Sequence, residues 1–149
     1  MCRSTGRGFW KTLVWPSDTG YYDIFAFGAS PHQAAYLLGL ILAGDKTATS
    51  SAVLEYEATE TPIPEPGALS IVLNEYGQPS CAIETHTVHR LPFSEVDFTL
   101  CSKEGEDENL ASWQNNHLDF FKEIAHEFGL EFTKESEIIF EEFRVVYSS

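Results

Sequence analysis

The sequence has few positive charges. Nine lysines and arginines stand against 23 aspartates and glutamates among 149 residues, which gives a formal net charge of -14. Sequence-independent affinity for duplex nucleic acid comes from neutralising many phosphates with Lys and Arg. The composition therefore excludes a tight general duplex binder, but it remains compatible with a small local pocket for a nucleotide or a short single strand.

Cysteine is scarce, and long apolar runs are missing. Cys2, Cys81 and Cys101 lie far apart, without the close spacing of a zinc site or a redox dithiol. No window approaches the roughly twenty apolar residues of a membrane span. The N-terminus does not lead into the apolar core of a signal peptide. We therefore expect reduced thiols, no membrane partner and a cytoplasmic location.

Low-complexity tracts and internal repeats are also absent. With 43% hydrophobic and 13% aromatic residues, the composition is that of a folded protein despite the net charge. The length suits one domain with its own core and is short for two ordinary domains. We predict a single domain over 1–149, in which residues 1–20 form an N-terminal extension that packs on the rest.

Two helices are predicted with clear ends. Ser30, followed by Pro31 and Gln33, is typical of a helix start, because the serine caps the helix and proline suits its first position. The apolar residues that follow run to Gly44, which suits the left-handed conformation that ends helices. A second helix, ending at Gly129, is predicted by apolar spacings of three and four residues: Leu110, Trp113, His117, Phe121, Ile124 and Phe128.

The other regular segments are rich in β-branched and aromatic residues, as strands are. We expect strands over 21–27, 49–57, 68–73, 80–89 and 138–147, a weaker one over 130–133, and a hairpin turn at 74–78. Strands mostly follow strands along the chain. The predicted class is therefore α+β, with an antiparallel, barrel-like sheet.

Lys46 is the most isolated charge in the chain. It is the only lysine or arginine between Lys11 and Arg90, a stretch that carries nine acidic residues. A single ammonium beside the hydroxyls of Thr47 and Thr49 is suited to bind an anion or to polarise a substrate oxygen. The alternative interpretation is a solvated lysine at a turn between a helix and a strand.

An acidic run precedes the second predicted helix. Glu106, Asp107 and Glu108 suit a solvated helix start, because carboxylates there interact favourably with the helix dipole. Alternatively, two or three of these carboxylates hold a divalent metal ion, although hard cations usually draw ligands from several segments. Glu104 differs, because a turn at the following Gly105 would direct its side chain inward.

Several common catalytic motifs are missing. The glycines form neither GxxxxGK nor GxGxxG, which argues against a phosphate-binding loop. A zinc hydrolase is disfavoured because His126 has no second histidine four residues later, and His86 and His89 would point to opposite faces of a strand. His117, on the apolar stripe, fits a hydrogen-bonded core histidine better than a metal ligand.

The order of short motifs resembles that of ASCH-domain proteins. The most specific part is the combination of GxKTxT at 44–49, EGE at 104–106 and WxxxHxxFF from Trp113. The similarity covers roughly residues 21–147 and includes weaker pieces: Phe27-Gly28, Pro66 to Leu73, Pro92-Phe93 with Val96, and Glu142-Phe143 with Val145-Val146. It implies a PUA-like fold, which is a small antiparallel or mixed β-barrel with flanking helices, and a cleft for RNA or a modified nucleoside.

The resemblance also implies site residues. Some small ASCH proteins remove the acetyl group of N(4)-acetylcytidine with a lysine, a threonine three residues later and a distant glutamate. Here these correspond to Lys46, Thr49 and Glu104, with Glu106 as the other candidate carboxylate. The expected substrate-binding residues are Thr47, Arg90, Lys103 and Glu106.

This chain departs from the larger ASCH pattern at two places. Cys101-Ser102-Lys103 stands where the pattern has an alanine-bearing segment, and Gln114 replaces an arginine. The loss of that arginine weakens the case for a phosphate-rich RNA ligand.

The chemistry of the three catalytic candidates stays open between two assignments. In one, Thr49 is the nucleophile, neutral Lys46 is its base and Glu104 protonates the leaving nitrogen; in the other, Glu104 activates water and charged Lys46 stabilises the oxyanion. Residues 46 and 49 of a regular strand would face opposite sides. Joint action therefore needs Lys46 in the preceding turn, or a bulge near Thr47.

Two other functions remain alternatives. One is a non-catalytic RNA-binding module with aromatic side chains and scattered cations near Lys46. The other is a single-strand ribonuclease, since a larger ASCH relative is reported to have that activity, and it would bring a divalent metal. An amidohydrolase of this type needs no cofactor, and the sequence predicts no particular oligomeric state.

Overall fold

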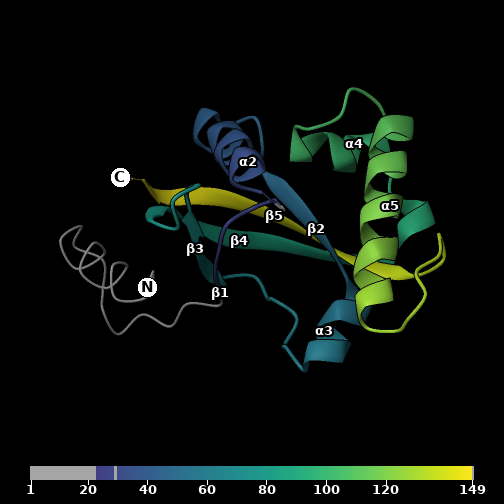
Figure 1. The fold of residues 1–149 in the computed structure, drawn as a ribbon. Coiled ribbons are helices and arrows are strands. Elements are labelled where there is room, and N and C mark those ends of the chain that lie inside the picture. The colour runs from purple at the N-terminus through teal and green to yellow at the C-terminus, as the bar shows by residue number, and fades with distance from the viewer. Residues whose placement is uncertain (1–22, 29, 149) are drawn as a thin grey trace.

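The fold is built on one curled, mixed β-sheet that resembles half of a barrel (Figure 1). The computed structural model describes residues 23–28 and 30–148. The strand order is β1-β3-β4-β5-β2, in which β1 is parallel to β3 and the other neighbours are antiparallel. The strands are β1 Asp23–Phe25, β2 Ala48–Ala52, β3 Leu69–Leu73, β4 Pro79–Pro92 and β5 Glu137–Ser148.

Four helices and two short 3-10 turns accompany the sheet in the described part of the chain. Figure 1 shows α2 and α5 near opposite ends of the long strands β4 and β5. The helices are α2 Pro31–Ala43, α3 Val53–Thr59, α4 Phe98–Cys101 and α5 Leu110–Glu127, and the 3-10 turns are η1 Phe93–Glu95 and η2 Ser102–Glu104. No helix of the described residues is long and apolar enough to cross a membrane.

Each long helix covers its own apolar core. α5 contributes Trp113 and Phe121 to a cluster that includes Phe140 of β5. α2 contributes Leu38 and Ile41 to a second cluster, which holds Val72, Cys81, Ile83, Phe27 and Phe143. The segment between α2 and β2 therefore lies where the two cores meet.

The helix boundaries confirm the capping signals in the sequence. The Ser30 hydroxyl accepts a hydrogen bond from the Gln33 amide at 3.2 Å, and α2 ends at Gly44 with a φ of 84°. α5 begins after Asn109, which caps the Ser112 amide. The predicted hairpin 74–78 is also present, closed by the bond from Asn74 N to Gln78 O.

Two strand predictions were wrong. The predicted strand 49–57 ends at Ala52, and α3 follows directly. The seven residues of α3 mix apolar and acidic side chains in a pattern that fits both the helical and the strand period, so tertiary contacts decide which one forms. One such contact joins the Tyr56 hydroxyl to the Ser51 hydroxyl at 2.6 Å. The segment 130–133 is a loop that places Phe132 in the α5 core.

Other differences concern length and short elements. β4 extends three residues beyond the predicted end to Pro92, because it pairs with β5 along its whole length. α4 and η2 were not predicted. The proposed extension at 1–20 lies outside the described residues.

Candidate functional site

Lys46 lies in the turn between α2 and β2. After Gly44, the amides of Asp45 and Lys46 both donate to the Leu40 carbonyl, at 2.8 and 3.1 Å. Strand β2 begins two residues later, at Ala48. This is the turn position that joint action of Lys46 and Thr49 would require.

The Lys46 side chain is buried, and its ammonium has three acceptors. Lys46 is 2% exposed, and its Nζ donates to Glu106 Oε2 at 2.7 Å, Ala48 O at 3.0 Å and Glu104 Oε1 at 3.3 Å. An ammonium has three N–H donors, so all are used. Nζ also lies 5.4 Å from the centre of the Phe27 ring. The alternative of a solvated lysine is therefore wrong.

Glu104 is the second buried charge of the site. One carboxylate oxygen accepts from Lys46, and the other accepts from the Ser50 hydroxyl and the Trp113 indole, both at 2.8 Å. Burial raises the pKa of Glu104, but the His117 contact, the Lys46 charge and the Trp113 bond outweigh it and lower the pKa to about 2. Glu104 therefore remains a carboxylate at physiological pH.

His117 completes the group of charges. Its Nδ1 is 3.0 Å from the Trp113 carbonyl, and its Nε2 is 3.4 Å from Glu104 Oε2. Both partners are acceptors, so a protonated ring satisfies both nitrogens. Burial lowers the pKa of His117, but the hydrogen bond and charge of Glu104 and the charge of Glu106 raise it above its ordinary value. With His117 protonated, two cations balance two carboxylates.

A backbone contact brings the two halves of the site together. The Thr47 amide donates to the Lys103 carbonyl at 2.7 Å, and the Thr47 hydroxyl contacts the same oxygen at 3.4 Å. Gly105, with a φ of 73°, packs directly against the Asp45 carbonyl. The GxKTxT and EGE segments therefore touch through their backbones as well as through side chains.

Thr49 lies on the opposite face of β2 from Ser50, because side chains alternate along a strand. Its cross-strand partner is Glu141, whose Oε1 accepts from the Thr85 hydroxyl at 2.9 Å. No side-chain hydrogen bond joins Thr49 to Lys46 within the described residues. The hydroxyl that reaches the Lys46 and Glu104 pair is that of Ser50.

The two predicted substrate-binding cations, Lys103 and Arg90, pair with glutamates other than Glu104 and Glu106. Lys103 Nζ binds Glu142 Oε1 at 2.7 Å, and the other oxygen of Glu142 is 2.6 Å from His89. Arg90 is exposed and pairs with Glu137 at 3.0 Å. Neither side chain contacts Lys46 in the described structure. Of the expected binding residues, only Glu106 contacts the Lys46 ammonium.

Comparisons with known proteins show the family and the fold of this chain. Residues 23–147 match the ASCH domain. The chain belongs to the ASCH-domain family. The crystal structure of an ASCH domain from Lactobacillus crispatus is similar to it, with a TM-score of 0.84, 30% identity and coverage of 97% of this chain and 95% of that one.

Other solved structures extend the comparison. An Enterococcus faecalis protein of the DUF984 family gives a TM-score of 0.85 at 28% identity, covering 99% of this ASCH domain's chain and 88% of its own. A mutant ASCH protein from Zymomonas mobilis gives 0.50 at 12% identity, over 82% and 67% of the chains, which shows the fold alone. A comparison with curated proteins finds no significant match.

The sequence did not predict that three residues of this ASCH domain contact Glu104. Trp113 and His117 were assigned to an apolar stripe, and Ser50 was not singled out. The spacing of Trp113 and His117 could have indicated a shared contact. Residues four apart on a helix share a face, so one carboxylate is able to contact both side chains. Nothing in the local sequence marks Ser50.

Metal binding was considered only as an alternative. Among the described residues, no group of three or more His, Cys, Asp and Glu side chains is arranged to hold a metal ion. What the arrangement does provide is an ammonium shared by two carboxylates. Glu104 is almost fully buried, whereas the Glu106 side chain is 25% exposed.

We predict that the stability of this ASCH domain declines on both sides of a window between about pH 5 and pH 6.5. The pKa of Glu104 is lowered from 4.5 to about 2, so its contribution is present above 4.5 and is lost as the pH falls towards 2. The pKa of His117 is raised above 6.5, so its contribution is full below 6.5 and is lost at higher pH. The Glu104 contribution corresponds to about 3 kcal/mol.

Urea unfolding between acidic and alkaline pH tests this dependence. His117→Gln should remove much of the alkaline decline, because it removes the group whose pKa is raised. His32→Gln, at an exposed position in α2, should leave the profile of the wild type. An unchanged alkaline decline in His117→Gln would contradict the assigned role of His117.

Proposed function

We propose that this ASCH domain hydrolyses the amide of an N(4)-acylated cytidine, or of a closely similar acylated pyrimidine nucleoside. The observation that carries the proposal is the unequal burial of the two carboxylates on Lys46. Glu104 is 2% exposed and has four partners, while Glu106 reaches the surface. A substrate oxygen that binds the ammonium would therefore take the position of Glu106, the more exposed of the two carboxylates.

The first step is an exchange of acceptors on Lys46. All three N–H groups are engaged, so an entering acyl oxygen must take one of them. Displacing Glu106 leaves Lys46 held by Glu104 and the Ala48 carbonyl. The ammonium then donates to the oxygen on which negative charge develops, and a buried, fixed donor is effective at stabilising such an oxyanion.

The displaced Glu106 carboxylate is then available as a general base. It takes a proton from water while the water oxygen attacks the acyl carbon. Glu104 is less suited to this role, because it is buried and all its partners hold it in place. Its low pKa also disfavours it as the proton donor that one of the two assignments required.

His117 is the best supported proton donor for the leaving nitrogen. Its side chain is 14% exposed and its pKa is raised. Its Nε2 makes the longer of the two ring contacts, 3.4 Å to Glu104 against 3.0 Å for Nδ1, so the Nε2 proton is the one that a leaving nitrogen would take. Transfer of this proton to the exocyclic nitrogen accompanies cleavage of the carbon–nitrogen bond. The products are the free carboxylic acid and cytidine, and the proton held by Glu106 restores His117 through solvent.

Thr49 receives less support as a nucleophile. Its side chain belongs to the face of β2 that carries Glu141, and it has no described bond to Lys46. Water activated by a carboxylate, with Lys46 charged, is therefore the preferred assignment.

Incubation with N(4)-acetylcytidine, followed by chromatography for cytidine, tests the proposed reaction. We expect saturable release of cytidine, with N(6)-acetyladenosine as a poor substrate because its larger base presents the amide differently. Absence of turnover at every pH between about 5 and 9 would contradict the proposal. Oligonucleotide binding without turnover would favour an RNA-binding module, and metal-dependent cleavage of RNA would favour a ribonuclease.

A further inference from the structure

Two lysines stand out because they have no carboxylate partner. Four of the six described lysines and arginines pair with glutamates: Lys46, Arg90, Lys103 and Arg144. Within the described residues, Lys122 and Lys134 form no ion pair. Both lysines line the same cavity, in a chain whose net charge is -14.

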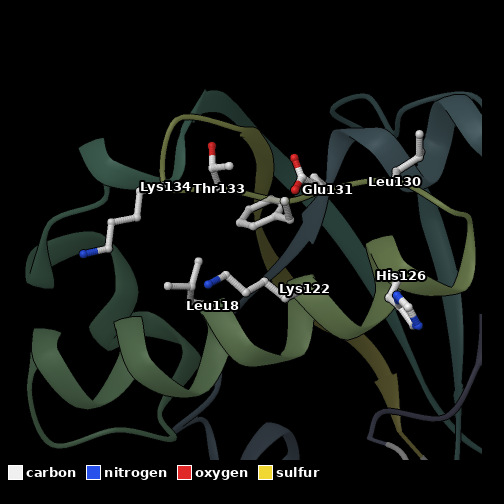
Figure 2. A pocket seen from close by; sticks show the side chains of 8 residues that line it. Leu118, Lys122, His126, Leu130, Glu131, Thr133 and Lys134 are labelled. Carbon is white, nitrogen blue, oxygen red and sulfur yellow. The ribbon is translucent and has the colours of Figure 1, made fainter.

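This cavity lies between α5 and the loop that follows it (Figure 2). Its volume is about 430 Å³, which is within the range of small-molecule sites. The α5 residues Leu118, Lys122 and His126 are spaced by four, so they share one face of the helix. The loop supplies the other lining residues: Leu130, Glu131, Phe132, Thr133 and Lys134.

The two positive charges of the cavity lie towards one end, and its one carboxylate, Glu131, lies nearer Leu130 (Figure 2). Figure 2 shows the Lys122 and Lys134 side chains extending towards the same end, near Leu118, with His126 and Leu130 at the other end. Phe132 is 3% exposed and belongs to the core beneath. A ligand with an anionic group at one end and an apolar body would match both features.

We propose that this cavity binds a small organic anion, either a carboxylate or a phosphate monoester with an aromatic or alkyl body. A long polyanion is disfavoured, because only two unpaired cations are present and the chain as a whole is strongly acidic. The cavity shares no residue with the Lys46 site, so the inference does not depend on the proposed hydrolysis. Residues 130–133 form a loop and not the predicted strand, and the side chains of this loop make one wall of the cavity.

Titration of the isotope-labelled chain with phenyl phosphate, followed by amide chemical shifts, tests this site. We expect shifts confined to residues 118–134. Inorganic phosphate lacks the apolar body and phenol lacks the anion, so each should bind at least about fivefold more weakly. Benzoate in place of phenyl phosphate distinguishes a carboxylate site from a phosphate site.

Charge-matched variants separate the two lysines from the general field of the protein. Lys122→Gln and Lys134→Gln should each weaken phenyl phosphate binding by about tenfold. Arg144→Gln makes the same change in net charge elsewhere and should alter it by less than about twofold. Absence of shifts at about 10 mM ligand, equal binding of inorganic phosphate, or an equal loss in Arg144→Gln would each overturn the proposal.

Discussion

Replacement of Lys46 by methionine is expected to lower the free energy of unfolding by about 3–5 kcal/mol, the usual effect of breaking a buried ion pair by removing one partner. Methionine fills much of the same volume, so the loss is mainly electrostatic. Glu104 would remain buried without its cation and Glu106 would lose its closest partner. Urea unfolding at neutral pH measures the change.

Two further variants isolate the charge effect. Arg144→Met breaks an exposed pair with Glu84 and should cost less than about 1 kcal/mol. Adding Glu104→Gln to Lys46→Met should recover part of the lost stability, because it removes the unpaired charge. If Lys46→Met is no more destabilising than Arg144→Met, the ion cluster does not stabilise the fold as argued.

Replacement of Gly105 by alanine has the second large expected effect. At a φ of 73°, an added Cβ would overlap the Asp45 carbonyl oxygen, which is backbone and has little freedom to move. Strain from the left-handed conformation costs about 1–2 kcal/mol, and overpacking adds about 1–3 kcal/mol. The two segments that carry Lys46 and Glu104 would be forced apart.

Gly77 provides a matched comparison for this variant. Its φ is 75°, and an added Cβ would meet nothing within 4 Å. Gly77→Ala should therefore show only the conformational cost, about 1–2 kcal/mol, in the same unfolding measurement. Equal losses in the two alanine variants would show that close contact between the segments is unimportant.

The ends of the two long helices, α2 and α5, were predicted more accurately than the end of β2, for a physical reason. Capping residues such as Ser30 and Gly44 act locally, so their effect is readable from a few neighbours. The end of β2 depends on which residues β5 offers for pairing, and β5 lies far along the chain. Local pattern alone was therefore unable to place the change from strand to helix at Val53.

The site was predictable only in part, and by different means. Lys46 was conspicuous as an isolated charge, but its partner Glu104 is 58 residues away and was linked to it through the family resemblance. Ser50 joins the site because β2 turns that face towards the α5 core. The pairing of Lys103 with Glu142 was not predicted, because it depends on tertiary structure.

The unequal exposure of Glu104 and Glu106 bears on which of them is the functional carboxylate, a question that the sequence left open. Either glutamate of the EGE segment was a candidate carboxylate. Glu104 is enclosed and has a low pKa, which suits it to hold Lys46 and His117 in place. Glu106 reaches the surface and contacts the same ammonium, which suits it to meet a substrate.

Turnover of N(4)-acetylcytidine by Glu106→Gln, compared with Glu108→Gln, is the most direct test of this division of roles. Glu108 is an exposed carboxylate two residues further along, so its variant makes the same chemical change outside the cluster. We predict a loss of about 10²–10⁴-fold in Glu106→Gln, typical of removing a general base, and wild-type turnover in Glu108→Gln. Wild-type turnover in a folded Glu106→Gln protein would contradict the account.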